Sequence, residues 1–544
     1  MSAAFLVSCL VVVTACCCGT LAGAQPTVRL TDVFRGASLD VSSHSDKKVR
    51  QLGTRSSAAR APVVRYVGHT ASTVPGNFVL VRLSESSGSV FPDAASAAAV
   101  FDAQPAAVLF LIARDASPQE VQRIESAYWK SPWSFPVLFE RETANASALL
   151  ALLESGKPFL GLASPAGGLT GNPAPLEHAA EPLQLLSVHL GAAKKVAKRK
   201  IAVVAHADTF GVAPGLVAGA NAGSGAIALL ELIRIVGSHT LPADAAVTFL
   251  LSTAGRHSYA GSRHWLTNVT KTASIAEDEY DLVVCLESIM GPGELYAQTA
   301  APKADKGGAS LHPVMDSFLR RLAASGDKAT VVSRRIDLLR SELAFEHEVF
   351  AHRGMAALTL TTLPAAIPQV QRSSFGDRFS DETRDSSLQG LLRRIDAVAG
   401  AVVAAASSSD EEPSSSTSPV LKADSAFVKG LLVLHDRTAR PALAFPSSLA
   451  TEYRQLATRA AAAVGQKVRA HSLDFRPADV TVYNHWQMEV TFFEVRPASF
   501  EATLTLAVLG YLAAFAAWLS SSDRTALDIA RASLFGSGKS KVAS

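Results

Sequence analysis

A histidine and an aspartate separated by one residue form the clearest chemical pattern in this chain. His206 and Asp208 follow a short apolar run at residues 201–204, which predicts a buried strand. In open α/β sheets, the loops at the carboxyl ends of strands hold the functional site. A histidine followed two positions later by an aspartate is typical of a metal ligand with its orienting carboxylate. The alternative is a loop histidine with no ligand role.

A resemblance to a known enzyme family marks further candidate positions in the same half of the chain. They are Asn221 in the glycine-rich turn 219–225, Gly255 and Arg256 after the run 246–251, Glu287 at the end of the run 282–286, and Asp377 four residues before Asp381. The resemblance implies that these positions lie in one site with His206 and Asp208.

These ordered landmarks resemble the zinc aminopeptidases of the M28 family over roughly residues 201–405. Members of that family carry H-x-D, then G-A-x-D-N-x-S-G, then E-E before G-x-x-G-S. A strand ending in Asp follows, and then a His four residues before an Asp. The resemblance implies two zinc ions with about five ligands, and a glutamate that acts as general base for the attacking water.

The reactive groups that the resemblance calls for are largely missing. The bridging-carboxylate position is Asn221, or Ala220 in a shifted alignment, and the Glu-Glu pair falls on Gly255-Arg256. Loss of a general base alone typically costs a factor of about 10²–10⁴ in rate. We therefore predict a pseudoenzyme without catalytic residues, bound metal or cofactor.

Two alternatives to this prediction remain open. Glu287 replaces the family aspartate and Asp377 replaces the final histidine, so a single weakly held ion at His206, Glu287 and Asp377 is one of them. The other is a membrane-tethered zinc aminopeptidase that uses atypical ligands.

Apolar runs alternating with helical patterns predict an α/β fold. We expect a mostly parallel, M28-like sheet flanked by helices, a smaller N-terminal α/β lobe and one C-terminal transmembrane helix. The predicted segments are a signal peptide (1–24), the lobe (25–185), the M28-like domain (186–405), a disordered linker (406–420), a membrane-proximal region (421–499), the transmembrane helix (500–520) and a cytosolic tail (521–544).

The two ends of the chain predict a single-pass type I protein of the endoplasmic reticulum membrane. An apolar N-terminal stretch ends in Ala22-Gly23-Ala24, which is typical of a signal-peptidase site. Residues 502–519 carry no charge and are just long enough for a helix across a hydrocarbon core of about 30 Å. Basic residues outnumber acidic ones in the tail, which indicates its cytosolic side.

Net charge, cysteine content and glycosylation sequons further limit the classes of protein that fit this sequence. The chain has 544 residues with a net charge of +3, which gives no indication of nucleic-acid binding. Only Cys285 lies beyond the predicted signal peptide, so no internal disulfide supports the lumenal part. Asn145 and Asn268 begin glycosylation sequons in the predicted lumenal part.

Two charged runs lie outside the M28 landmarks. We interpret Glu346-His347-Glu348 as a solvated helix face, with a structural or partner-facing role as the alternative. The basic run at residues 194–200 is interpreted as a solvated edge rather than a binding patch.

Several segments further resemble the nicalin family, the inactive membrane-anchored branch of the M28 group. They are residues 206–214, 335–338, 345–351, 371–374 and 495–498. The single mature cysteine differs from nicastrin-type ectodomains, which rely on several disulfides. The resemblance implies a scaffold subunit at the Sec translocon that assists multipass membrane proteins. It also implies the nodal modulator protein and a small multipass membrane protein as partners.

Overall fold

The computed structural model describes residues 28–35, 39–42, 49–54, 59–68, 74–130, 132–156, 158–165, 175–176, 182–192, 197–272, 280–291, 293–301, 311–336, 343–379, 384–407, 421–463, 465–475, 480–483, 487–494 and 498–521. The predicted signal peptide, most of the predicted linker, the predicted tail beyond residue 521 and Asp381 lie outside these residues.

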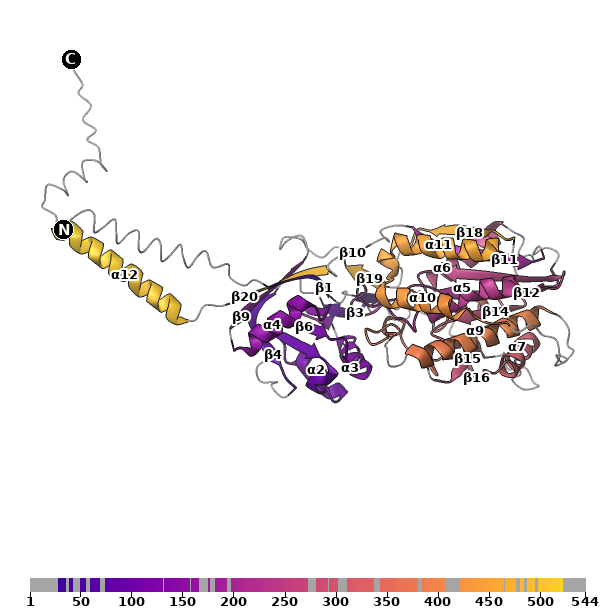
Figure 1. Cartoon of the computed structure of the whole chain (residues 1–544), viewed down its shortest axis with the longest axis horizontal. Helices are drawn as coiled ribbons and strands as arrows, with labels where there is room; N and C mark the ends of the chain where they lie inside the picture. The colour runs from indigo at the N-terminus through magenta and orange to yellow at the C-terminus, as the bar shows by residue number, and fades with distance from the viewer. Residues whose placement is uncertain are drawn as a thin grey trace, which may run out of the picture. The chain divides into compact units, whose positions relative to one another are not determined.

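An eight-stranded sheet is the centre of the M28-like region (Figure 1). Its strand order is β16 (Ala329–Arg334), β15 (Leu295–Ala300), β17 (Ala357–Thr361), β14 (Leu282–Leu286), β12 (Arg199–His206), β13 (Ala245–Ser252), β11 (Leu183–Gly191) and β18 (Val468–Leu473). The four inner strands β17, β14, β12 and β13 run parallel, whereas β11 and β18 on one side and β15 on the other pair antiparallel with their inner neighbours. The predicted parallel strands thus form the centre of a mixed sheet.

Helices cover one face of this sheet. They are α5 (Ser224–Gly237), α7 (Pro313–Ala324), α9 (Arg384–Ala406), α10 (Ser425–Arg437) and α11 (Ser447–Ala462). Their apolar side chains pack with alternate strand residues such as Val203, while the neighbouring Val204 points to a second core. Because successive residues of a strand face opposite sides, strands buried on both faces read as continuous apolar runs.

The second core joins the other face of the sheet to an N-terminal α/β lobe. The parallel strands of the lobe are β4 (Ala59–Tyr66), β5 (Phe78–Leu83), β6 (Ala107–Ile112) and β8 (Val137–Arg141), and its helices include α2 (Ala94–Asp102), α3 (Pro118–Tyr128) and α4 (Ala144–Glu154). Aromatic rings fill its interior, as in the pair Phe110 and Phe139, whose ring centroids lie 5.2 Å apart.

Strands from distant parts of the chain complete the sheets of the lobe. β1 (Val28–Arg35), β20 (Gln487–Glu494) and β9 (Phe159–Pro165) close the lobe sheet into a barrel with order β1-β20-β9-β4-β5-β6-β8. A five-stranded sheet has the order β10 (Pro175–Leu176), β19 (Val480–Tyr483), β2 (Leu39–Ser42), β3 (Val49–Thr54) and β7 (Pro132–Trp133). Residues expected in a separate membrane-proximal region therefore pair with N-terminal strands.

The last described element is the helix α12 (Ala498–Ser521), which contains the segment predicted to span the membrane. Among the described residues, no helix meets the combined length and hydropathy requirements of a membrane span. The transmembrane helix is therefore not confirmed.

Candidate functional site

The predicted site positions converge at the carboxyl ends of three inner strands. His206 ends β12 and pairs in register with Ser252 at the end of β13, while Glu287 directly follows β14. Asp208 and Arg256 lie on the loops that leave β12 and β13, and the Arg256 backbone N–H donates a hydrogen bond to the Asp208 carboxylate. This arrangement follows from the parallel centre of the sheet, because the carboxyl ends of parallel strands meet at one edge.

His206 does not pair with Asp208 as the sequence predicted. Asp208 instead accepts hydrogen bonds from the backbone N–H groups of Gly255 (2.7 Å) and Arg256 (3.0 Å), so its carboxylate holds the β13 loop. The imidazole Nδ1 of His206 lies 3.4 Å from Oε2 of Glu346, a fully buried carboxylate. Oε1 of Glu346 accepts from the hydroxyls of Ser252 (3.1 Å) and Ser262 (2.5 Å).

The His206 ring fills the space beside Gly255, where the M28 resemblance places the general base. A Cβ atom built on Gly255 would lie 2.2 Å from Cγ of His206, a separation that real side chains do not adopt. The imidazole and a side chain at position 255 are therefore mutually exclusive in this packing. Gly255 does not have a positive φ, so its backbone conformation does not call for glycine. The contact with the His206 ring is what requires glycine at this position.

Glu287 is surrounded by donors. Its Oε1 accepts from Nη1 of Arg256 (2.6 Å) and Nη1 of Arg372 (2.9 Å), and its Oε2 accepts from the Tyr259 hydroxyl (2.9 Å). Burial opposes ionisation of this carboxyl, but the two guanidinium groups outweigh burial and hold its pKa well below the usual range. Glu287 is therefore a carboxylate whose oxygens are already engaged.

Asp377 organises the turn that begins α5. Its two carboxylate oxygens accept from the backbone N–H groups of Asn221 (2.7 Å) and Ala222 (2.8 Å). The Asn221 side-chain oxygen accepts from the N–H of Met290 (3.1 Å) and so braces the loop after β14. Burial raises the pKa of Asp377, although the two backbone hydrogen bonds oppose this shift.

Arg440 joins the two halves of the site and was missed by sequence reasoning. It lies beyond α10, is fully buried, and donates to the backbone carbonyls of Ala207 (2.8 Å) and Gly219 (2.9 Å). Its Nη1 also donates to the carbonyls of His435 (2.9 Å) and Thr438 (3.0 Å). No motif marked this arginine, because two of its partners, the carbonyls of Ala207 and Gly219, lie more than 200 positions away in the sequence.

The interpretation of Glu346-His347-Glu348 as a solvated helix face is wrong. The three residues are 0%, 2% and 5% exposed, and His347 and Glu348 lie on the short helix α8 (His347–Ala351). His347 contacts the hydroxyl of Thr359 through both its backbone N–H and Nδ1, and burial lowers its pKa to about 3. The run is a structural part of the site, which its charged composition concealed.

Backbone strain is concentrated around the same loops. Among the described residues, five that are not glycine have positive φ: Gln104, Ala254, Ser258, Tyr259 and Ser288, and the last four flank Arg256 or Glu287. Left-handed conformations cost non-glycine residues roughly 1 kcal/mol or more each. The hydrogen bonds around these loops must therefore offset the conformational cost of the positive φ angles.

The donor set does not fit a pair of zinc ions. A di-zinc centre needs a bridging carboxylate and free ligand lone pairs. Here Asn221 is an amide, while Asp208, Glu287 and Asp377 all accept hydrogen bonds from nearby donors. Within the described residues, no three His, Cys, Asp or Glu side chains are grouped so that they could hold a metal ion.

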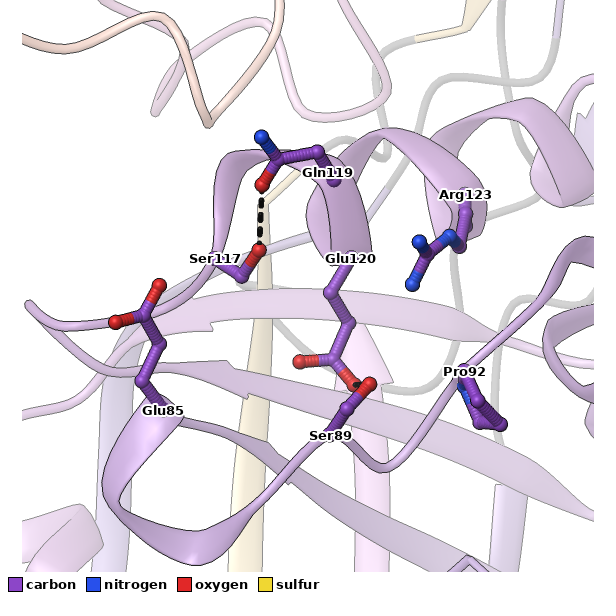
Figure 2. A pocket seen from close by; sticks show the side chains of 7 residues that line it. All are labelled: Glu85, Ser89, Pro92, Ser117, Gln119, Glu120 and Arg123. Carbon is purple, nitrogen blue, oxygen red and sulfur yellow. Dashed lines mark hydrogen bonds between the residues drawn. The ribbon is translucent and has the colours of Figure 1, made fainter.

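A separate shallow cavity of about 420 Å³ lies on the N-terminal lobe (Figure 2). Its lining residues are Glu85, Ser89, Pro92, Ser117, Gln119, Glu120 and Arg123. Glu120 accepts from the backbone N–H of Phe91 (2.7 Å), and Arg123 donates to the carbonyl of the same residue (2.7 Å). These two charged groups are engaged in holding the loop before α2.

Residues 188–402 match the family described as peptidase family M28. The chain is 27% identical over 332 residues to the human "BOS complex subunit NCLN", and 27% identical over 344 residues to the Caenorhabditis elegans protein "Nicalin".

The chain is similar in sequence to nicalin.

The matched region covers 57% of this chain and 56% of the human relative, and 58% of this chain and 59% of the C. elegans nicalin. The chain thus spans little more than half of the length of these nicalin relatives. Among solved structures, the gamma-secretase component nicastrin matches with a TM-score of 0.55 and 12% identity, covering 86% of this chain and all of that chain. This likeness shows a shared fold.

One carboxyl near the site predicts a pH-dependent stability. Glu125 of α3 accepts from the backbone N–H of Phe375 (2.9 Å), and burial raises its pKa to about 7. The folded protein keeps this proton between pH 4.5 and 7, where the unfolded chain releases it, so stability falls as pH rises through this window. We expect Glu125→Gln to exceed wild type in free energy of unfolding by up to about 3 kcal/mol above pH 7, and to match it below pH 4.5.

Denaturant unfolding at both pH values measures this difference. Glu294→Gln, at an exposed carboxyl, is the control and should leave the free energy of unfolding nearly unchanged at each pH. A Glu125→Gln effect that does not vary with pH would contradict the assignment.

Proposed function

We propose that this protein is a non-enzymatic scaffold subunit of a membrane complex in the endoplasmic reticulum. Two curated relatives carry the names "BOS complex subunit NCLN" and "Nicalin", and the former states membership of a complex. The observation that carries the non-enzymatic part is Gly255, because the His206 ring takes up the space that a general base would need. An M28-type hydrolysis needs a general base at this position to activate water, and glycine cannot supply one.

The proposed partners follow from the resemblance to nicalin. They are the nodal modulator protein, a small multipass membrane protein and the Sec translocon, in an assembly that assists insertion and folding of multipass membrane proteins. A lumenal α/β domain without chemistry is suited to binding, since a domain of this size can bury an interface of more than 1,000 Å², roughly the size of a specific complex.

We further propose a single-pass topology with the folded domains in the lumen. Asn145 is exposed on α4 and is available to a glycan, and Asn268 lies on α6 (Ala260–Thr272). Apolar side chains of α12 are exposed, for example Leu506 at 70% and Leu509 at 55%. Exposed apolar surface of this kind indicates contact with lipid or another helix, which supports residues 500–520 as the membrane anchor.

Affinity capture tests the proposal. The tagged full chain, solubilised from microsomes in mild detergent, should co-purify with the nodal modulator protein, the multipass partner and Sec translocon subunits. The captured chain should lose apparent mass on treatment with a glycosidase specific for high-mannose glycans, and an Asn145→Gln variant should shift less.

A truncation ending at residue 497 serves as the matched control. It should leave the membrane on alkaline washing, keep its glycan, and lose the multipass partner. Recovery of presenilin-type subunits instead would move the assignment to a nicastrin-like complex. Aminopeptidase turnover by the purified chain that is lost in His206→Ala would favour the zinc aminopeptidase alternative.

A further inference from the structure

We propose that three arginine side chains, Arg256, Arg372 and Arg440, supply at this site the positive charge that metal ions supply in M28 zinc peptidases. The site is then a fixed guanidinium–carboxylate network that assembles without metal. This inference rests on the donor set of the site and does not depend on the proposed scaffold role.

Arg256 and Arg372 replace a cation at Glu287. Both side chains are fully buried, and their Nη1 atoms lie 2.6 Å and 2.9 Å from the same oxygen, Oε1. Two donors converging on one carboxylate oxygen resemble the way two metal ions share a bridging ligand. Arg372 is held in turn by the carbonyls of Ile367 and Ala344 and by the ring of Phe345, whose centroid lies 4.7 Å from its Cζ.

Arg440 is a further buried cation of the site, and its guanidinium binds backbone carbonyls. The charges of Asp377 and Asp208 both act on its guanidinium, and burial disfavours its charged form. Its donors draw together carbonyls from the loop after β12 and from the turn before α5, at Ala207 and Gly219. A metal ion in a loop-lined site organises separate segments in the same way, by collecting oxygen atoms around one positive charge.

The site already contains buried cations. Its four buried carboxyl groups, Asp208, Glu287, Glu346 and Asp377, lie in one region with three buried guanidinium groups. A divalent cation would have to compete with these fixed charges at close range, where like charges repel strongly in a low-dielectric interior. The geometry therefore favours arginine over metal at Glu287.

Exchange of the arginines for neutral side chains tests this directly. Thermal unfolding of the purified full chain in detergent would be followed with EDTA and with added ZnCl₂, MgCl₂ or CaCl₂. We expect the wild-type Tm to move by less than about 1 °C, because no added ion binds the folded state preferentially. Arg256→Met/Arg372→Met leaves Glu287 without counter-charge, so its Tm should drop strongly and then rise by several degrees with a divalent cation.

Two further variants keep the test decisive. If the double variant does not fold even with added metal, the single variant Arg256→Met replaces it in the test. Its Tm should fall by less than that of the double variant and should rise by a smaller amount when a divalent cation is added. A Tm that does not rise with the cation would overturn the proposal. Arg320→Met, which breaks the exposed ion pair with Asp316, is the control and should show neither effect. Stoichiometric zinc in the wild-type protein, with a Tm lowered by EDTA, would also overturn the arginine proposal. That outcome would not affect the affinity-capture test of the scaffold role.

Discussion

Gly255→Glu should unfold the M28-like domain rather than restore a general base. The new Cβ would lie 2.2 Å from Cγ of His206, and the glutamate would add a charge to a site already holding Asp208, Glu287 and Glu346. Overpacking and an unpaired buried charge together should cost more than about 3 kcal/mol. We expect a loss of soluble, folded protein or a fall in Tm of about 10 °C or more, measured by thermal unfolding.

Gly255→Ala separates the steric part from the charge. It should also lower Tm, because the clash begins at Cβ. Gly430→Ala is the matched control, since a Cβ at Gly430 of α10 meets nothing within 4 Å and alanine favours the helix. A stable Gly255→Glu variant with peptidase activity would refute both the packing argument and the proposed lack of catalysis.

Arg440→Met should detach the C-terminal helices from the site. Four backbone carbonyls lose their donor, two of them at Ala207 and Gly219 within the loops that carry the remnant positions. Each buried acceptor left unpaired costs about 1–3 kcal/mol, so a total on the order of 4 kcal/mol is expected. Hydrogen exchange should show the largest loss of protection in residues 207–223 and in α10.

Arg437→Met is the control for this prediction. Arg437 is an exposed arginine at the end of α10, three positions before Arg440, and its loss should leave Tm and exchange protection unchanged. Protection lost evenly over the whole chain would show that Arg440 supports global stability without a special role at the site.

Sequence reasoning located the predicted site positions through their order in the M28 resemblance, and three of them follow strongly apolar strands. His206, Arg256 and Glu287 lie after β12, β13 and β14, whose buried residues form continuous runs. Residue type was sufficient to predict these three strands, since strands buried on both faces read as continuous apolar runs.

The partners of those positions could not be predicted in the same way. Glu346, Arg372 and Arg440 reach the site from the position before α8, from the loop before α9 and from beyond α10, and their contacts span up to 233 positions. Hydrogen bonds from a side chain to a distant backbone carbonyl leave no periodic trace. Charge was also misleading, because Glu346-His347-Glu348 has the composition of a solvated surface but is buried by specific partners.

The barrel of the lobe has a consequence for synthesis on the ribosome. β20 lies between β1 and β9, so the sheet that begins with the first described strand cannot close until residue 494 has emerged. At a typical elongation rate of about 5–20 residues per second, the roughly 320 residues between β9 and β20 take on the order of tens of seconds to translate. During that interval β1 and β9 lack their common neighbour and present unpaired strand edges, which makes the nascent lobe a candidate client for folding assistance.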